Sequence, residues 1–163
     1  MRRVLLRVAV ATLLLVAVTG QAGGKPGGPK WRGIPEGEAE AKKTGKPALY
    51  FFTAEWCVPC HTIEKEVFAD PKTAMAIEKR YVPIICEDTF REEGANPPGF
   101  NEVARRFGLQ GFPTLVVARP GSLRGVRLTG WSGVDATRKF LDVAASRLNE
   151  AEAAKAKTAG EEP

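Results

Sequence analysis

Apolar and polar positions alternate along the middle of the chain in blocks that predict strands and helices in turn. Residues 48–53 are apolar or aromatic at nearly every position, which is typical of a central strand covered on both faces. Helices are expected where apolar residues recur three or four positions apart. The expected elements, in chain order, are a helix at 36–43, a strand at 48–53, helices from Pro59 and from Pro71, a strand at 82–86, a helix from Pro97–Pro98 to Phe107, strands at 114–118 and 124–128, and a helix from Ser132 to Leu148. This order predicts an α/β domain with a central mixed sheet and helices on both faces.

Two of the expected helices begin with sequences that cap helix N-termini. Asp70 precedes Pro71, and an acidic cap followed by proline in the first turn is typical of a helix start. Ser132 and Asp135 resemble a capping box, with Asp in place of the usual Glu. We therefore expect the Asp70 and Ser132 side chains to bind the first backbone N–H groups of their helices.

The two ends of the chain differ in composition from its middle. Residues 1–22 begin with basic residues, continue with an apolar run at 8–18 and end with small or polar residues, which is typical of a secretory signal peptide. The run is shorter than the about 20 residues of a membrane span, although an uncleaved segment would tether the domain to the membrane. Residues 23–34 are rich in Gly and Pro and are interpreted as a flexible linker, and residues 150–163 as a polar tail, either a helix continuation or a solvated segment. The functional domain is therefore expected at 35–149.

Composition and charge narrow the class of protein. Apolar residues make up 44% of the chain and charged residues 26%, which excludes a wholly disordered chain. Cleavage of the leader would remove Arg2, Arg3 and Arg7, which lowers the count of Lys and Arg from 24 to 21 against 19 Asp and Glu, a net charge of about +2. No dense basic stripe remains, so nucleic acid is not expected as a partner.

The candidate chemistry lies in residues 55–61, Glu-Trp-Cys-Val-Pro-Cys-His, directly after the strand at 48–53. Two cysteines three positions apart, at a junction between strand and helix, can close a small disulfide ring. A thiol at a helix N-terminus is stabilised as the thiolate, which is the attacking species in disulfide exchange. Cys57 is therefore the expected nucleophile, and Cys60, one turn into the helix, is the thiol that resolves the mixed disulfide.

Other functions fit the same cysteines. In an exported protein, Cys57 and Cys60 could form a permanent structural disulfide. Together with His61, and with Cys86 further along the chain, they could bind a soft or borderline metal ion such as Cu(I) or Zn²⁺. The sequence Cys-Val-Pro-Cys-His also matches the c-type haem attachment motif, in which His61 would be the iron ligand. Alone on its strand, Cys86 is otherwise expected to be a buried small apolar side chain.

A second motif, Gly-Phe-Pro-Thr at residues 111–114, adjoins the expected strand at 114–118. Together with the CxxC sequence after a buried strand, this motif makes residues 46–149 resemble the thioredoxin superfamily. The resemblance implies the thioredoxin fold and thiol–disulfide oxidoreductase activity toward protein substrates. It implies no cofactor, since a dithiol itself carries the two electrons.

The resemblance also assigns roles around the dithiol. The peptide bond before Pro113 would be cis, and its loop would face Cys57. The backbone of Phe112 would pair with an extended stretch of substrate. Trp56 is expected either to form a lid beside the thiol that also contacts the substrate or to pack in the core. Trp31, by contrast, is expected only to pack.

Two flanking segments narrow the resemblance. Gly-Lys-Pro at 45–47 and Glu-Val-Phe-Ala-Asp-Pro at 66–71 are similar to the C-terminal periplasmic domain of the transmembrane thiol:disulfide interchange reductase and to its free-standing relatives. The Val-Pro pair between the cysteines resembles exported reductants that serve cytochrome c maturation. These likenesses favour reduction, in the periplasm or after secretion, with a membrane-embedded electron donor as a further partner. A monomer is expected.

One departure from the superfamily concerns proton transfer. Many thioredoxins have a buried Asp six positions before the first cysteine, and Phe51 stands there in this chain. The lysine that often pairs with this Asp is replaced by Ile84 in the alignment that we infer for the second strand. An apolar pair in place of a buried ion pair leaves no buried charge unpaired. Glu55, Glu87 and Asp88 are the candidate substitutes for the proton-carrying Asp.

Overall fold

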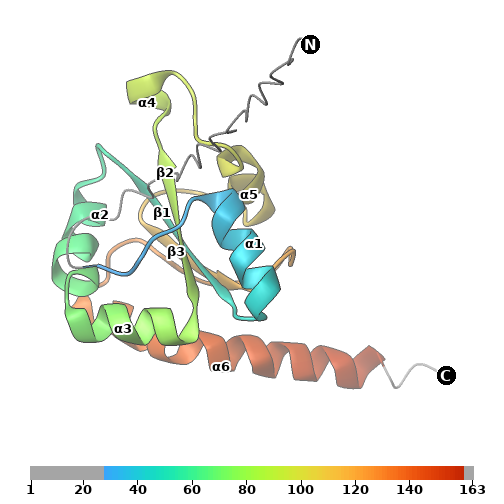
Figure 1. The fold of residues 1–163 in the computed structure, drawn as a ribbon. Coiled ribbons are helices and arrows are strands. Elements are labelled where there is room, and N and C mark those ends of the chain that lie inside the picture. Colours follow the sequence, from blue (N-terminus) through green and yellow to red (C-terminus); the bar gives the residue numbers. More distant parts are fainter. Residues whose placement is uncertain (1–27, 160–163) are drawn as a thin grey trace, which may run out of the picture.

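The computed structural model describes residues 28–159 (Figure 1). The predicted signal peptide at 1–22 and residues 23–27 of the predicted linker lie outside this range. None of the helices within 28–159 is both long enough and apolar enough to cross a membrane. The described range covers the whole of the predicted domain at 35–149.

The centre of the domain is a four-stranded sheet in the order β2-β1-β3-β4. Strand β1 (Ala48–Ala54) pairs in parallel with β2 (Val82–Asp88) and antiparallel with β3 (Thr114–Ala118). Strand β4 (Val126–Thr129) pairs antiparallel with β3. The prediction of a mixed sheet is confirmed.

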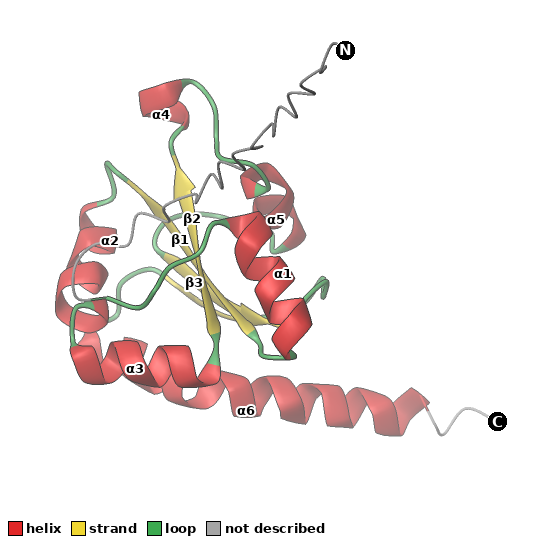
Figure 2. Ribbon diagram, viewed as in Figure 1, coloured by secondary structure: helices red, strands yellow, loops and turns green. Residues whose placement is uncertain are grey.

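Helices cover both faces of this sheet (Figure 2). The helical segments are α1 (Ile34–Thr44), α2 (Val58–Ile63), the π-helix η1 (Glu64–Phe68), α3 (Pro71–Arg80), α4 (Phe90–Glu93), α5 (Phe100–Arg106) and α6 (Val134–Ala159). On one face, α2, η1, α3 and α6 pack against β1 and β3. On the opposite face, α1 and α5 pack against β1 and β2. The predicted arrangement of helices on both faces is confirmed.

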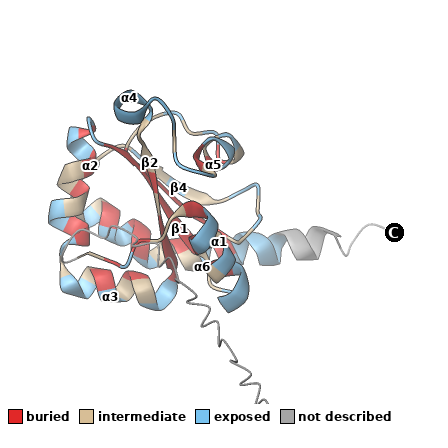
Figure 3. Ribbon diagram, turned by 45° about the horizontal axis from the view of Figure 1, so that its top comes forward, coloured by how far each residue is buried: buried red, intermediate tan, exposed pale blue. Residues whose placement is uncertain are grey.

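Two apolar cores, one on each face of the sheet, hold these layers together (Figure 3). Strand β1 contributes to both cores because alternate residues of a strand face opposite sides. Leu49 and Phe51 lie in the core beneath α2, and Tyr50 and Phe52 lie in the core beneath α1. All of β1 is buried, which explains its place inside the sheet rather than at an edge.

Of the predicted helix starts, that of α3 is confirmed and that of α5 lies later in the chain than predicted. The Asp70 carboxylate accepts hydrogen bonds from the Thr73 N–H (3.2 Å) and hydroxyl (2.7 Å), so its predicted capping role is confirmed. The helix expected from Pro97–Pro98 begins only at Phe100, because Gly99 before it has a φ of 85°, in the left-handed region, and breaks the helical conformation. The short helix α4, between β2 and α5, was not predicted.

Helix α6 differs from its prediction at its start, and at its other end it follows one of two alternatives, since residues 150–163 are expected as a helix continuation or a solvated tail. It begins at Val134, directly after Gly133, whose φ of 96° is in the left-handed region. Ser132 therefore stands outside the cap position, and no hydrogen bond of the described residues closes the predicted capping box. At its other end α6 continues through Ala159, so most of the predicted polar tail is helical.

Part of the predicted linker is built into the domain. Trp31 is buried against Phe51 and Phe68, with ring centroids 5.7 and 5.1 Å away, so its expected packing is confirmed. Arg32 forms a parallel bridge opposite Ile84, with two backbone hydrogen bonds of 3.0 Å to the edge of β2. The flexibility expected from Gly and Pro does not extend to these residues, because burying a large aromatic ring offsets the lost chain freedom.

Candidate active site

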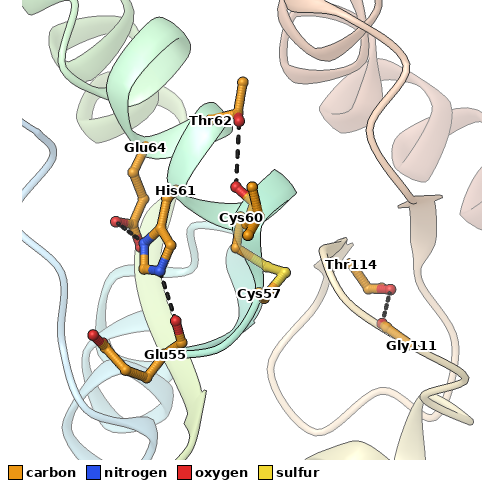
Figure 4. The surroundings of a disulfide bond; sticks show 9 residues. Glu55, Cys57, Cys60, His61, Thr62, Glu64, Gly111 and Thr114 are labelled. Carbon is orange, nitrogen blue, oxygen red and sulfur yellow. Dashed lines mark hydrogen bonds and ion pairs between the residues drawn. A yellow bond between two sulfur atoms is a disulfide. The ribbon is translucent and has the colours of Figure 1, made fainter.

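The two cysteines of the CxxC sequence lie where β1 meets the helix that follows it (Figure 4). The Cys57 N–H donates to the Ala54 carbonyl (3.0 Å), which closes the turn after β1. Cys57 directly precedes α2, Cys60 lies in its first turn, and a disulfide joins them across a Cα–Cα distance of 5.2 Å. Pro59 fits between them because first-turn N–H groups have no partner within a helix. The expected pairing of the two cysteines is confirmed.

The two cysteines differ in how they meet solvent. Cys60 is fully buried, whereas Cys57 is 3% exposed. The side chains of Trp56 and Val58, on either side of Cys57 in the chain, are both exposed. An incoming molecule therefore meets Cys57 before Cys60.

A loop from the second half of the chain faces the disulfide (Figure 4). The peptide bond between Phe112 and Pro113 is cis, as expected. The Thr114 hydroxyl donates a hydrogen bond to the Gly111 carbonyl, and the Gly130 N–H donates one to the Pro113 carbonyl. Both bonds are 2.8 Å long, and they hold the loop on either side of Phe112. Within residues 28–159, neither the N–H nor the C=O of Phe112 has a hydrogen-bond partner. This stretch of backbone is available to an extended peptide.

Trp56 stands between the cis-proline loop and α4. Its ring meets the Phe112 ring edge to face, with centroids 5.5 Å apart. The guanidinium carbon of Arg91 lies 4.1 Å from the centroid of the Trp56 ring, within cation–π distance. The structure thus brings the predicted Trp56 and Phe112 together. The sequence analysis did not identify Arg91. The only sequence feature that could have drawn attention to it is the length of the segment that follows β2.

His61 turns away from the disulfide (Figure 4). Its Nε2 is 2.7 Å from the Glu55 carbonyl oxygen, which can only accept, so Nε2 carries the hydrogen and donates it. Its Nδ1 lies 3.7 Å from a Glu64 carboxylate oxygen. The imidazole therefore ties the start of the CxxC turn to the helix after it.

The structure separates the residues that the alternative functions need. Cys86 lies in the core beneath α1, whereas Cys57 and Cys60 belong to the core on the other face. No group of three or more His, Cys, Asp or Glu side chains in the described range is arranged to hold a metal ion. The disulfide leaves neither thiol free for haem attachment. The expectation that Cys86 is buried is confirmed, and burial raises the pKa of its thiol well above the usual value.

Comparison with known proteins decides the family. The thioredoxin-like domain family matches residues 34–145. The chain belongs to this family. With its CxxC disulfide it is a thioredoxin-like thiol–disulfide oxidoreductase, which confirms the predicted fold and reaction class.

Curated relatives match a little over half of this chain and a small part of their own length. The chain is 32% identical over 99 residues to the protein disulfide-isomerase erp38 of Neurospora crassa, an alignment that covers 61% of this chain and 24% of that protein. It is 33% identical over 94 residues to the thiol:disulfide interchange protein DsbD 2 of Pseudomonas aeruginosa, which covers 56% of this chain and 15% of that protein. The alignments thus span a quarter or less of these relatives.

Solved structures share the thioredoxin-like fold. A thioredoxin from Thermus thermophilus superposes with a TM-score of 0.55 at 28% identity, covering 69% of this chain and 83% of that one. The DsbH oxidoreductase gives 0.61 at 17% identity, covering 81% and 96%. The oxidised C-terminal domain of DsbD from Neisseria meningitidis gives 0.52 at 21% identity, covering 68% and 90%. The last two likenesses show the fold alone.

The apolar pair expected at Phe51 is present, but its predicted second member, Ile84, is wrong. The register of β1 and β2 places Ile85, not Ile84, opposite Phe51. Ile84 lies opposite Tyr50, in the core on the other face. The error is one residue, and a shift of one residue in a strand reverses the face. The pair beneath α2 is therefore Phe51 and Ile85.

The three candidate acids for proton transfer lie in different surroundings. Glu87 follows Ile85 by two positions on β2, so it is on the face of the sheet that carries the disulfide. The Asp88 carboxylate accepts a backbone N–H (3.1 Å) at the start of α4. Glu55 is exposed at the turn before Cys57. Its position on the face that carries the disulfide therefore makes Glu87 the favoured candidate for proton transfer among the three acids.

Proposed function

We propose that this thioredoxin-like domain is exported and reduces disulfides in protein substrates, in the periplasm or after secretion. The observation that carries the proposal is the disulfide of Cys57 and Cys60 opposite a loop with an unpaired backbone at Phe112. A permanent structural disulfide needs no peptide-binding edge beside it. A bridge that closes so short a loop also constrains the unfolded chain little.

The reaction starts from the reduced dithiol. The Cys57 thiolate, at the first turn of α2, attacks one sulfur of the substrate disulfide, and the other substrate sulfur leaves as a thiolate. A mixed disulfide between Cys57 and the substrate results. The Cys60 thiolate then attacks the Cys57 sulfur, which closes the protein disulfide and releases the second substrate sulfur. Two electrons pass to the substrate, and the two protons of the dithiol end on the substrate thiols.

The surroundings of Cys57 suit a protein substrate. An extended segment would form strand-like hydrogen bonds with the N–H and C=O of Phe112, while its cysteine meets Cys57. Trp56 would cover one side of this segment, because its half-exposed ring already contacts the Phe112 ring. Pro113 completes the loop on the other side.

Each turnover leaves the protein oxidised, so a reductant must restore the dithiol. A dithiol partner supplies two electrons by the same exchange run in reverse. The leader-like sequence at 1–22 supports export, and a membrane-embedded donor would keep the domain reduced in an oxidising compartment. The similarity to thiol:disulfide interchange proteins supports exchange with another dithiol. We expect the domain to act as a monomer.

Trapping of substrates tests the two cysteine roles. Cys60→Ser should accumulate mixed disulfides through Cys57, because the resolving thiol is gone. The matched control Cys57→Ser should trap few partners. Non-reducing gels of both variants, expressed with the native leader, give the measurement. Equal trapping by the two variants would overturn the roles.

The direction of electron flow is tested separately. Equilibration of the wild-type dithiol with glutathione buffers gives its reduction potential. A value near the about −270 mV of thioredoxin supports a reductase, and one near the about −120 mV of strong periplasmic oxidants would overturn that direction.

A further inference from the structure

We infer that Arg91 determines substrate specificity by favouring proteins with an acidic side chain close to the reactive cysteine. The inference rests on the proposed function, since it concerns substrates of the same dithiol. The Arg91 guanidinium lies over the Trp56 ring, 4.1 Å from its centroid, and Trp56 directly precedes Cys57. A positive charge therefore lies against the residue that directly precedes the nucleophile.

The contact with Trp56 occupies the face of the guanidinium and leaves its edges open. A guanidinium carries five N–H donors in one plane, and a carboxylate can accept two of them at once. Within the described residues, none of the Arg91 donors is bound to a carboxylate or a carbonyl oxygen. Because the ring already holds the side chain, binding a carboxylate there costs less conformational entropy than at a mobile arginine.

The segment around the helix that carries Arg91 is held together by its own hydrogen bonds. The Thr89 N–H donates to Oδ1 of Asn96 (3.0 Å), and the Phe90 N–H donates to Oδ1 of Asp88 (3.1 Å). These bonds close the segment around α4 into a compact unit beyond the end of β2 (Figure 1). These bonds are internal to residues 88–96 and α4 has no buried residue, so the contact of Arg91 with Trp56 links α4 to the active-site turn.

The side chains form a row from the cis-proline loop to α4. Phe112 contacts Trp56, and Trp56 contacts Arg91. In this proposal, a substrate strand that pairs with Phe112 and brings its cysteine to Cys57 runs along this row. Each extended residue advances about 3.3 Å, so a side chain one or two positions from the substrate cysteine comes within reach of the guanidinium.

The same helix carries two negative charges, on Glu92 and Glu93, which are both exposed. No hydrogen bond or ion pair in the described range holds either carboxylate. They are therefore fully solvated, whereas the exposed guanidinium of Arg91 also packs on the indole. A charge that packs on a ring discriminates between substrates more strongly than one that is only solvated.

Short chromogenic peptides test the inference. Each peptide has blocked ends and one cysteine joined by a disulfide to 5-thio-2-nitrobenzoate, and either Asp or Asn stands directly before or directly after that cysteine. The pre-reduced protein transfers two electrons and releases the peptide thiol and the yellow thiol, which is followed by absorbance. The quantity compared is the ratio of the rate constants for the Asp and Asn peptides.

We expect the wild-type protein to favour Asp in at least one of the two positions. Arg91→Gln should lower that ratio by about threefold or more, the size of a charged hydrogen bond at a surface. Arg91→Lys should keep part of it, because the charge remains without the planar fork. The matched control is Arg124→Gln, which removes one exposed positive charge on the β3–β4 turn and should leave the ratio unchanged.

Each outcome separates the two proposals. An unchanged ratio in Arg91→Gln, or no preference for Asp in the wild-type protein, would overturn the specificity role while leaving the reductase function standing. A wild-type protein that reduces neither peptide would overturn the proposed function itself. Loss of the ratio in Arg124→Gln as well would overturn the role of Arg91, since net charge alone would then explain the preference.

Discussion

On the face of the sheet covered by α2, Cys57 stands where a strand ends and a helix begins, between the exposed side chains of Trp56 and Val58. On the opposite face, Cys86 lies inside β2, opposite Phe52, with no exposed surface. Burial there raises the pKa of the thiol, so the reactive thiolate is disfavoured. The comparison teaches that a cysteine just beyond the end of a strand can react, whereas one inside a buried strand is kept from reacting.

The second face also differs in its polar contacts. The Tyr50 hydroxyl donates to the Glu38 carboxylate (2.7 Å), and the same carboxylate pairs with Arg106. Burial, strengthened by the bond to Glu38, raises the pKa of Tyr50 above its usual value. These contacts tie α1, β1 and α5 together on the side without the disulfide. We interpret them as structural.

The largest expected difference is between Cys57→Ser and Cys86→Ala. Cys57→Ser should reduce insulin at the background rate, because the attacking sulfur is gone. Cys86→Ala should retain turnover and lower the free energy of unfolding by about 1 kcal/mol, since it deletes one buried atom. Insulin turbidity and urea denaturation give the two measurements. A folded but inactive Cys86→Ala protein would break the comparison between the faces.

Glu38→Ala sharpens the comparison from the stability side. It leaves the Tyr50 hydroxyl and the Arg106 guanidinium without their carboxylate, which should cost about 1–3 kcal/mol in the free energy of unfolding. Turnover should not change. Lys43→Ala, on an exposed position of the same helix, is the control and should cost about 0.5 kcal/mol or less. Equal costs in urea denaturation would show that the network adds nothing.

Alkaline pH should lower the free energy of unfolding through Cys86, on the face of the sheet opposite the disulfide. In the oxidised protein, Cys86 is the only free thiol of the three cysteines. Its pKa is raised in the folded state, while the unfolded thiol ionises near about pH 8.5. Its contribution to stability is therefore complete below that pH and is lost above it, by at most about 1.4 kcal/mol per pH unit. Between about pH 8 and 9.5 the wild-type protein should lose more free energy of unfolding than Cys86→Ala, and parallel losses would contradict the burial.

The smallest expected effect belongs to His61, on the disulfide face. His61→Ala removes the hydrogen bond to the Glu55 carbonyl and should slow insulin reduction about twofold to threefold. His61→Gln keeps an N–H donor and should recover part of the rate. Stopped-flow tryptophan fluorescence of single turnovers gives the measurement. Equal rates in all three proteins would show that the imidazole does not position the CxxC turn.

The features that could be predicted from the sequence depend on neighbours a few positions apart. The CxxC pair and the cap at Asp70 each carry their own short motif, whereas the cis bond before Pro113 is expected only from the resemblance to the thioredoxin superfamily. The face of Ile84 could not be predicted, because consecutive apolar residues in β2 show no alternation. The contact of Arg91 with Trp56 joins segments far apart in the chain, and no local pattern marks such a pair.

The bridge between Arg32 and β2 should limit self-association of the protein. An open strand edge presents N–H and C=O groups that recruit strands from other chains. Here the segment around Trp31 and Arg32 shields part of that edge. A chain shortened to begin at Ile34 would uncover both the edge and an aromatic hollow, so it should self-associate on gentle warming. Light scattering that rises with protein concentration would reveal this before the helices unfold.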